Sequence, residues 1–243
     1  MTTERFDDAD VQEGSGFATI ADGVAATLRS EILTGKLLPA QRLRFEDMRA
    51  KYRVGVGTLR EALLLLSGDS LVQAFKQRGF RVAPASIADL IDIFENLKLI
   101  EIDALRRSVT AGNDEWEAQL LAAHHRMVRC EKRQAMQGSA ELDREWERYH
   151  LAFHEALIAA CGSPRLLRIC VQLREQALRY RHLAKVPPAQ HPTLTADHLP
   201  LMEAALARDV GAACAILLRH FDVTERVIVE GFAGKSVSKK RAR

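Results

Sequence analysis

Residues 54–63 read Val-Gly-Val-Gly-Thr-Leu-Arg-Glu-Ala-Leu, which is a glycine-containing break followed by the first turns of an amphipathic helix. The leucine spacing predicts a helix over residues 58–66 with one apolar face. The inward leucines are Leu59, Leu63 and Leu66. Thr58 and Arg60 then lie on the outer face near the start of the helix. A short helix of this kind is suited to presenting polar side chains to a partner.

The segments around this helix predict a small domain. Apolar residues recur at helical spacing over residues 20–32, and Gly35 supplies a stop. A second short helix is predicted over residues 45–52. After the central helix, residues 71–83 have the pattern of a β-hairpin whose tip is at residues 76–79. Three short helices followed by a hairpin form a winged helix-turn-helix unit.

In a winged helix-turn-helix unit the third helix enters the DNA major groove, and the wing lies along the backbone. The guanidinium of Arg60 can contact guanine or hold a phosphate, and Thr58 can hydrogen-bond to either. The candidate DNA-binding residues are Arg44, Thr58, Arg60, Lys76 and Arg78. For Arg60 taken alone, a surface ion pair with a neighbouring carboxylate is the alternative interpretation.

The charge distribution supports a division of the 243 residues into domains. Residues 1–16 are acidic and are predicted to be a disordered arm. Residues 17–84 hold eleven Lys or Arg and six Asp or Glu, which suits a unit that binds a polyanion. Residues 85–231 are mildly acidic and are predicted to form an effector-binding and dimerisation domain. Residues 232–243 form a basic tail, which is predicted to be unfolded from Lys235.

The longer domain is predicted to be a bundle of antiparallel helices with short connections, so the fold class is mainly α. Gly and Pro residues divide it into six helical segments. These segments cover residues 86–110, 114–137, 140–161, 164–184, 193–208 and 210–230.

The cysteines and the hydropathy pattern indicate a cytoplasmic protein. The four cysteines are widely spaced, with no Cys-x-x-Cys pair, which favours reduced thiols that are mostly buried. They are Cys130, Cys161, Cys170 and Cys214. No apolar run approaches the roughly 20 residues that a membrane-spanning helix needs. We therefore expect no membrane association.

Four histidines of the bundle are predicted to point inward from three helices. His150 and His154 are one helical turn apart and share a face. His198 and His220 each lie in an apolar stripe of a later helix. Converging neutral imidazoles suit Zn²⁺, with Ni²⁺ or Fe²⁺ also possible, better than Mg²⁺ or Ca²⁺. The alternative is that each histidine is an ordinary core residue with a satisfied hydrogen bond.

Several motifs together resemble the GntR-type regulators of the FadR subfamily, whose C-terminal half is the FCD effector domain. The matching pieces are the Leu59-Arg60-Glu61-Ala62-Leu63 run, the Arg78-Gly79 wing, the Phe153-His154 pair, and His198 followed after 22 residues by His220. The resemblance implies a homodimer that binds a pseudo-palindromic operator on double-stranded DNA. It also implies a transcriptional regulator, most simply a repressor of a catabolic operon, and a small organic acid bound beside a metal.

The resemblance implies a ligand set of one acid and three histidines, and this chain departs from it. His150 occupies the position of the acid, which leaves more net positive charge at the metal. In the family an Arg four residues before the position of Glu101 commonly holds the effector's carboxylate, but here that residue is Leu97. The residues assigned to effector binding are therefore Glu101, with Arg179 and Tyr180 as substitutes for the missing arginine.

Two other functions are compatible with the histidines. A helical metal-dependent enzyme would need an open metal position and a general base, and no residue is tied by a motif to that role. We therefore predict no catalytic residues and no enzymatic activity. A regulator for which the metal itself is the signal would use the same four residues.

Overall fold

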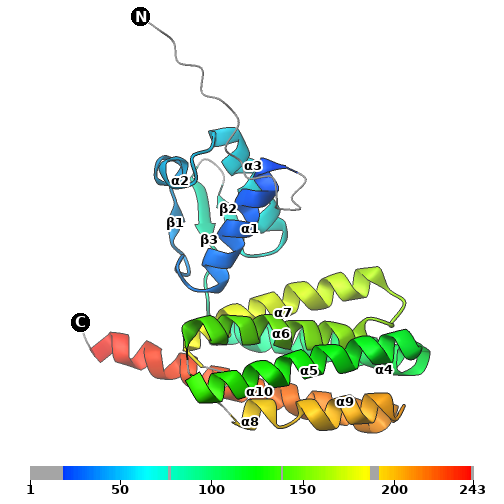
Figure 1. Ribbon diagram of the computed structural model, residues 1–243. Coiled ribbons are helices and arrows are strands. Elements are labelled where there is room, and N and C mark those ends of the chain that lie inside the picture. Colours follow the sequence, from blue (N-terminus) through cyan, green and yellow to red (C-terminus); the bar gives the residue numbers. More distant parts are fainter. Residues whose placement is uncertain (1–18, 76–77, 138, 187–191, 242–243) are drawn as a thin grey trace, which may run out of the picture. The chain divides into compact units, whose positions relative to one another are not determined.

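The computed structural model describes residues 19–75, 78–137, 139–186 and 192–241, and the protein is mainly helical (Figure 1). The chain divides into two compact units, and the boundary lies between Ala83 and Pro84. The predicted arm over residues 1–16 lies outside the described residues.

The first unit is a helical domain with a small antiparallel sheet. Its elements are α1 (Ile20–Leu33), β1 (Arg42–Leu43), α2 (Phe45–Tyr52), α3 (Val56–Gly68), β2 (Val72–Phe75) and β3 (Gly79–Val82). The strand order is β1-β3-β2, so β3 is the central strand. The hairpin β2–β3 is confirmed, and β1 adds a third strand in which Arg42 pairs with Arg81. A strand of two residues is too short to show an alternating pattern, which explains why the sequence did not reveal it.

The helix α3 begins at Val56, two residues earlier than predicted. Gly55 is in an extended conformation and caps the helix, and Gly57 lies within the first turn. The three inward leucines are completely buried, as expected, together with Leu28 and Ile32 of α1. Their packing fixes the orientation of α3, so its outer face is available to a partner.

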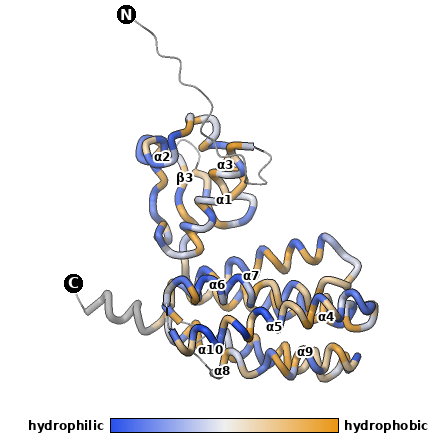
Figure 2. Tube along the Cα trace, in the orientation of Figure 1, coloured by the Kyte–Doolittle hydropathy of each residue, from blue (hydrophilic) through white to orange (hydrophobic). Residues whose placement is uncertain are grey.

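The second unit is a bundle of antiparallel helices. Its elements are α4 (Ile87–Ala111), α5 (Asp114–Gln137), α6 (Ala140–Ile158), α7 (Pro164–Ala184), α8 (Pro192–Thr195), α9 (His198–Leu206) and α10 (Val210–Arg241). The side-chain hydroxyls of Ser86, Ser139 and Ser163 accept hydrogen bonds from backbone N–H groups in the first turns of α4, α6 and α7. The apolar residues of the helices gather between them (Figure 2).

Two helix predictions in the bundle were wrong in detail. The segment predicted as one helix over residues 193–208 is two helices, because the chain turns at Asp197 before α9 begins. The carboxylate of Asp197 is held by Arg219, at 2.6 Å from Nη2. The tail predicted to be unfolded from Lys235 continues α10 through Arg241. No Gly or Pro follows Lys235, so nothing in that stretch breaks the helix.

Within the part of the chain that the structure describes, no helix is both long enough and apolar enough to cross a membrane.

Candidate functional site

The first unit has a broad surface groove lined by arginines from three separate segments. Arg44 precedes α2, Arg60 lies on α3, and Arg78 lies beside β3; all three are exposed and line the groove. Arg42 of β1 is a fourth, which the sequence did not single out. Thr58 is half-buried and does not line the groove, and Lys76 lies outside the described residues.

The side chain of Arg60 is oriented by an aromatic ring rather than by an acid. Its guanidinium carbon lies 5.7 Å from the centre of the Phe45 ring. Among the described residues, no carboxylate forms an ion pair with Arg60. A cation–π contact leaves the guanidinium donors available to an acceptor. The surface ion pair considered from the sequence is therefore absent there, and the groove keeps its positive charge.

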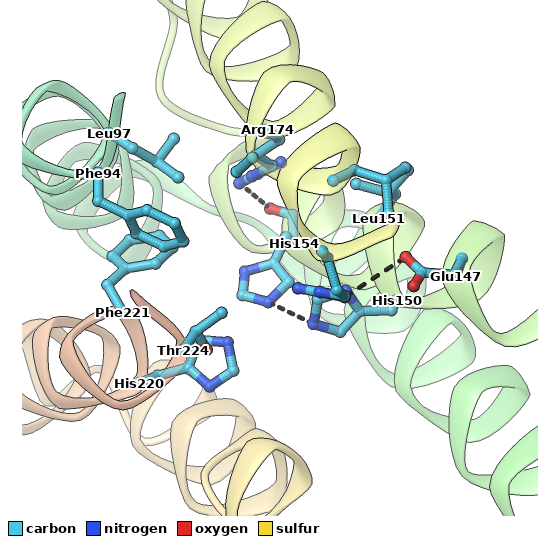
Figure 3. A pocket seen from close by; sticks show the side chains of 13 residues that line it. Phe94, Leu97, Glu147, His150, Leu151, His154, Arg174, His220, Phe221 and Thr224 are labelled. Atoms are coloured by element: carbon cyan, nitrogen blue, oxygen red, sulfur yellow. Dashed lines mark hydrogen bonds and ion pairs between the residues drawn. The ribbon is translucent and has the colours of Figure 1, made fainter. Parts of the chain in front are cut away.

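The second unit brings His150, His154, His198 and His220 together inside the bundle (Figure 3). One ring nitrogen of each lies within 4.8 Å of the corresponding atoms of the others. The Nε2 atoms of His150 and His154 are 3.1 Å apart. All four side chains are buried. The predicted convergence of the four histidines is confirmed, and the cluster could hold a metal ion.

Three helices position these imidazoles. His150 and His154 lie one turn apart on α6, His198 is the first residue of α9, and His220 lies on α10. The indole of Trp146 stacks on the ring of His150, with ring centres 4.6 Å apart. This aromatic packing limits rotation of the histidine ring, so the donor nitrogen is held in place.

Burial keeps these imidazoles neutral. It lowers the pKa of His150, His198 and His220 well below the usual value, and the mutual repulsion of the clustered rings adds to the effect. Neither ring nitrogen of His198 has a hydrogen-bond partner among the described residues. A buried imidazole without a partner is costly unless something binds its lone pair. The donor set therefore fits a divalent transition metal.

Glu101 of α4 lies directly behind the cluster. Its Oε1 is 3.4 Å from Nδ1 of His154, and its two oxygens are held by Arg174 of α7 at 2.5 and 2.8 Å. Burial acts to raise the pKa of Glu101, but the charge of Arg174 and the contact with His154 outweigh it and lower the pKa. An ionised carboxylate beside a ligating histidine orients the ring and raises its basicity. Glu101 is thus placed to support a metal ligand.

A small cavity of about 30 Å³ adjoins the histidines, and α7 supplies two arginines to it. Arg174 and Arg181 line this cavity together with Ala177 and Leu178 of the same helix. Their spacing of three, four and seven residues is that of one helical face. The sequence analysis missed both arginines, although the apolar residues between them carry that signal.

Arg179 and Tyr180, predicted to substitute for the missing effector-binding arginine, do not line the cavity. Both are buried and contact the start of the second unit. Arg179 donates a hydrogen bond to the carbonyl of Pro84, and the hydroxyl of Tyr180 donates to Asp89. They lie on a different face of α7 from Arg174 and Arg181, because adjacent residues of a helix point about 100° apart. Leu97 is buried and lines the cavity.

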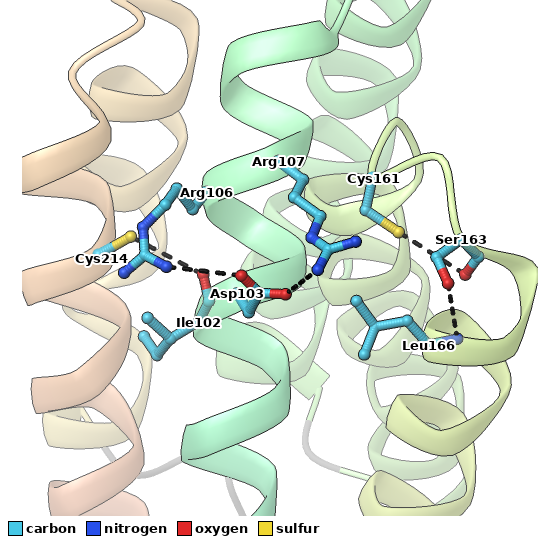
Figure 4. Close-up of polar contacts among 8 residues, drawn as sticks. All are labelled: Ile102, Asp103, Arg106, Arg107, Cys161, Ser163, Leu166 and Cys214. Atoms are coloured by element: carbon cyan, nitrogen blue, oxygen red, sulfur yellow. Dashed lines mark hydrogen bonds and ion pairs between the residues drawn. The ribbon is translucent and has the colours of Figure 1, made fainter.

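The four cysteines are free thiols, and Cys214 alone among them is not fully buried. The sulfur of Cys161 lies 3.8 Å from the carbonyl oxygen of Ser163, and that of Cys214 lies 3.9 Å from the carbonyl oxygen of Ile102 (Figure 4). Nearby, Asp103 pairs with Arg106 and Arg107 on the surface of α4 (Figure 4). The sulfur atoms pack locally and take no part in the histidine cluster.

A winged unit with an arginine-lined groove, followed by a helical bundle with inward histidines, defines a DNA-binding regulator with an effector domain. Residues 20–82 match the bacterial regulatory proteins of the gntR family, and residues 92–223 match the FCD domain. The chain belongs to the GntR family of transcriptional regulators and carries an FCD domain, in the manner of FadR. Its function is therefore in transcription and not in enzyme catalysis.

Relatives of known name are regulators of the same kind. The chain is 34% identical to the HTH-type transcriptional repressor GlaR of Escherichia coli (strain K12), over 85% of this chain and 94% of that protein. It is 35% identical to the HTH-type transcriptional regulator BphR of Paraburkholderia xenovorans (strain LB400), over 92% of this chain and 91% of that protein. The fold is similar to that of E. coli McbR/YncC, with a TM-score of 0.71, 18% identity and coverage of 90% and 100% of the two chains.

Proposed function

We propose that this protein is a repressor of a catabolic operon and that a small organic acid, bound beside a metal in the bundle, releases it from DNA. It acts as a homodimer on a pseudo-palindromic operator, with one groove of the first unit at each half-site. The observation that carries the proposal is the meeting of four neutral imidazoles with two arginines at one buried cavity. The repressor role is supported by the similarity to GlaR, which is named a repressor.

The four histidines would hold the metal, which we propose to be Zn²⁺, with Ni²⁺ or Fe²⁺ as alternatives. A bound divalent cation supplies a Lewis-acidic charge that attracts an anionic oxygen. Since His150 stands where relatives are expected to have an acid, no ligand of this set neutralises that charge. An anionic effector therefore has a strong electrostatic reason to bind here.

The helix α7 is suited to transmit the occupancy of the cavity. One of its faces carries Arg174 and Arg181 into the cavity. Another face holds the first residues of the second unit, through the bonds from Arg179 to Pro84 and from Tyr180 to Asp89. A shift of α7 on ligand binding would move the segment that leads to the DNA-binding unit. The coupling requires that the acid binds the two states of the dimer with different affinity.

A gel-shift assay on the DNA upstream of the protein's own gene tests the proposal. We expect binding by the metal-containing protein, release by a small carboxylate, and loss of binding in Arg60→Ala. Elemental analysis of the same preparation should find about one metal ion per chain. Unchanged DNA binding by Arg60→Ala would remove α3 from the mechanism, and a full screen of carboxylates without release would remove the organic acid.

A second candidate function is that the metal itself is the signal. The small size of the cavity favours it, because about 30 Å³ accommodates little more than a single small species beside the histidines. Titration of Zn²⁺, Ni²⁺ and Fe²⁺ into chelator-treated protein in the same gel shift separates the two functions. Metal sensing requires that the metal alone switches DNA binding without any acid.

A further inference from the structure

Two buried guanidinium groups of α7 face the histidine cavity, and both have unused hydrogen-bonding capacity. Arg174 is paired with Glu101, and Arg181 is paired with Glu147 of α6 at 3.4 Å. Within the described residues, Nη1 of Arg174 and Nε of Arg181 have no hydrogen-bond partner. An unpaired buried donor costs about 1–3 kcal/mol, so the arrangement favours a ligand that brings acceptor atoms.

The two pairs differ in strength. Arg174 contacts both oxygens of Glu101 at 2.5 and 2.8 Å, which fixes it in place. The contact of Arg181 with Glu147 is longer, and burial raises the pKa of the Glu147 carboxyl, which weakens it as a counter-ion. Arg181 is therefore the guanidinium that can most easily exchange its partner for an incoming anion.

The charges around the cavity call for an anion that carries more than one negative charge. The four imidazoles are neutral, and the two arginines are at most balanced by the two glutamates. A divalent cation on the histidines therefore leaves two positive charges inside the bundle. A buried charge without a counter-charge is strongly unfavourable. A dianion would balance this excess, whereas a monocarboxylate would leave one charge.

We infer that Arg174 and Arg181 form a carboxylate-binding subsite and that the effector is a short-chain dicarboxylate. One carboxylate faces the metal on the histidines, and the other accepts hydrogen bonds from Nη1 of Arg174 and Nε of Arg181. The apolar side chains of Phe94, Leu97 and Phe221 line the same cavity and suit the methylene groups between the two ends. The inference rests on the proposed function and replaces the family's arginine on α4 with arginines on α7.

Calorimetric titration of the full-length, metal-loaded protein tests the subsite. The probes are straight-chain dicarboxylates of two to six carbons and the monocarboxylates of the same chain length. We expect the best dicarboxylate to bind at least tenfold more tightly than its monocarboxylate. Arg181→Gln should weaken dicarboxylate binding at least tenfold and leave monocarboxylate binding nearly unchanged. Arg168→Gln, at an exposed position of the same helix, is the matched control and should bind like the unaltered protein.

Glu147→Gln provides an independent test in case Arg181→Gln does not fold. Removing the counter-ion frees Arg181, so dicarboxylate affinity should rise several-fold; an unchanged or reduced affinity overturns the inference. Equal binding of mono- and dicarboxylates, or full dicarboxylate affinity in Arg181→Gln with its metal intact, also overturns it. These results would leave the proposed function standing. Absence of metal from the unaltered protein, or DNA binding that no carboxylate relieves, would instead remove the proposed function.

Discussion

The two units of this protein place their functional side chains in opposite environments. In the first unit, the arginines of the groove are exposed, and the buried residues are almost all apolar. In the second unit, the functional groups are buried polar side chains, among them four histidines, two arginines and Glu101. Exposed charges cost the fold little, whereas buried polar groups must be paired or must bind a ligand. The first unit is therefore stable without its partner, while the stability of the second depends on what its site contains.

The largest expected effect is on metal-dependent stability. His198→Gln should lose the bound metal, and the rise in melting temperature that metal gives to the unaltered protein should disappear. A ligand present at a thousand times its Kd contributes about 4 kcal/mol. After treatment with chelator the variant should be at least as stable as the unaltered protein, because His198 then has two unpaired buried nitrogens. Calorimetric unfolding with and without chelator measures both quantities.

The matched control for this prediction is His125→Gln. His125 is exposed on α5 and lies outside the cluster, so its replacement should leave metal content and melting temperature unchanged. A His198→Gln protein that keeps its full metal content would contradict the assignment of the four ligands.

The second prediction concerns acid. All eight histidines lie in the second unit, and burial lowers the pKa of the clustered ones. Below about pH 6.5 the unfolded chain therefore binds protons that the folded bundle does not, and stability falls by about 1.4 kcal/mol per pH unit for each such histidine. In the first unit Glu31 has a lowered pKa: burial acts to raise it, but hydrogen bonds from Lys51 and Tyr52 outweigh this. Its contribution is lost only as the pH falls below about 4.3.

The two units should consequently unfold at different pH values, the bundle first. Both tryptophans, Trp116 and Trp146, are in the bundle, so their fluorescence reports its unfolding alone. Hydrogen exchange of peptides from α1 and α3 reports on the first unit. Simultaneous loss of both signals near pH 4 would show that the histidines do not set the acid stability of the bundle.

The same difference explains what could be predicted from the sequence. The three helices, the hairpin and the outward direction of Arg60 followed from the spacing of Leu59, Leu63 and Leu66, because a single apolar face fixes a small domain. The inward direction of the four histidines followed from the same periodicity. These features depend on local patterns, which a sequence displays directly.

The missed features depend on which helices meet. Arg174 and Arg181 were not recognised because a charged residue on an apolar stripe normally points away from the core. Their burial depends on Glu101 and Glu147, which lie 73 and 34 residues away along the chain. Arg179 and Tyr180 were assigned to the effector by proximity in sequence, without fixing the phase of α7. The pairing of β1 with β3 likewise joins residues about forty positions apart.

The third prediction separates base recognition from backbone contact in the groove. Arg44→Gln should weaken DNA binding by about 1 kcal/mol for every sequence and reduce the salt dependence by the equivalent of about one phosphate contact. Arg60→Ala should cost about 1–3 kcal/mol and relax the preference for the operator. Lys36→Gln, exposed but outside the groove, is the control. Equal salt slopes for Arg44→Gln and the unaltered protein, measured by fluorescence anisotropy, would exclude a phosphate contact.

The smallest expected effect on stability concerns the link between the two environments. Tyr180→Phe removes the hydrogen bond to Asp89, at 2.5 Å, and the one accepted from the backbone N–H of Ser86, at 3.0 Å. Because Asp89 and Ser86 are exposed and can bind water instead, the loss should be only about 1 kcal/mol. If α7 transmits ligand binding through these bonds, the carboxylate should bind normally but release DNA much less effectively. Tyr149→Phe on α6 is the control, and a full DNA response in Tyr180→Phe would show that the signal leaves the cavity by another helix.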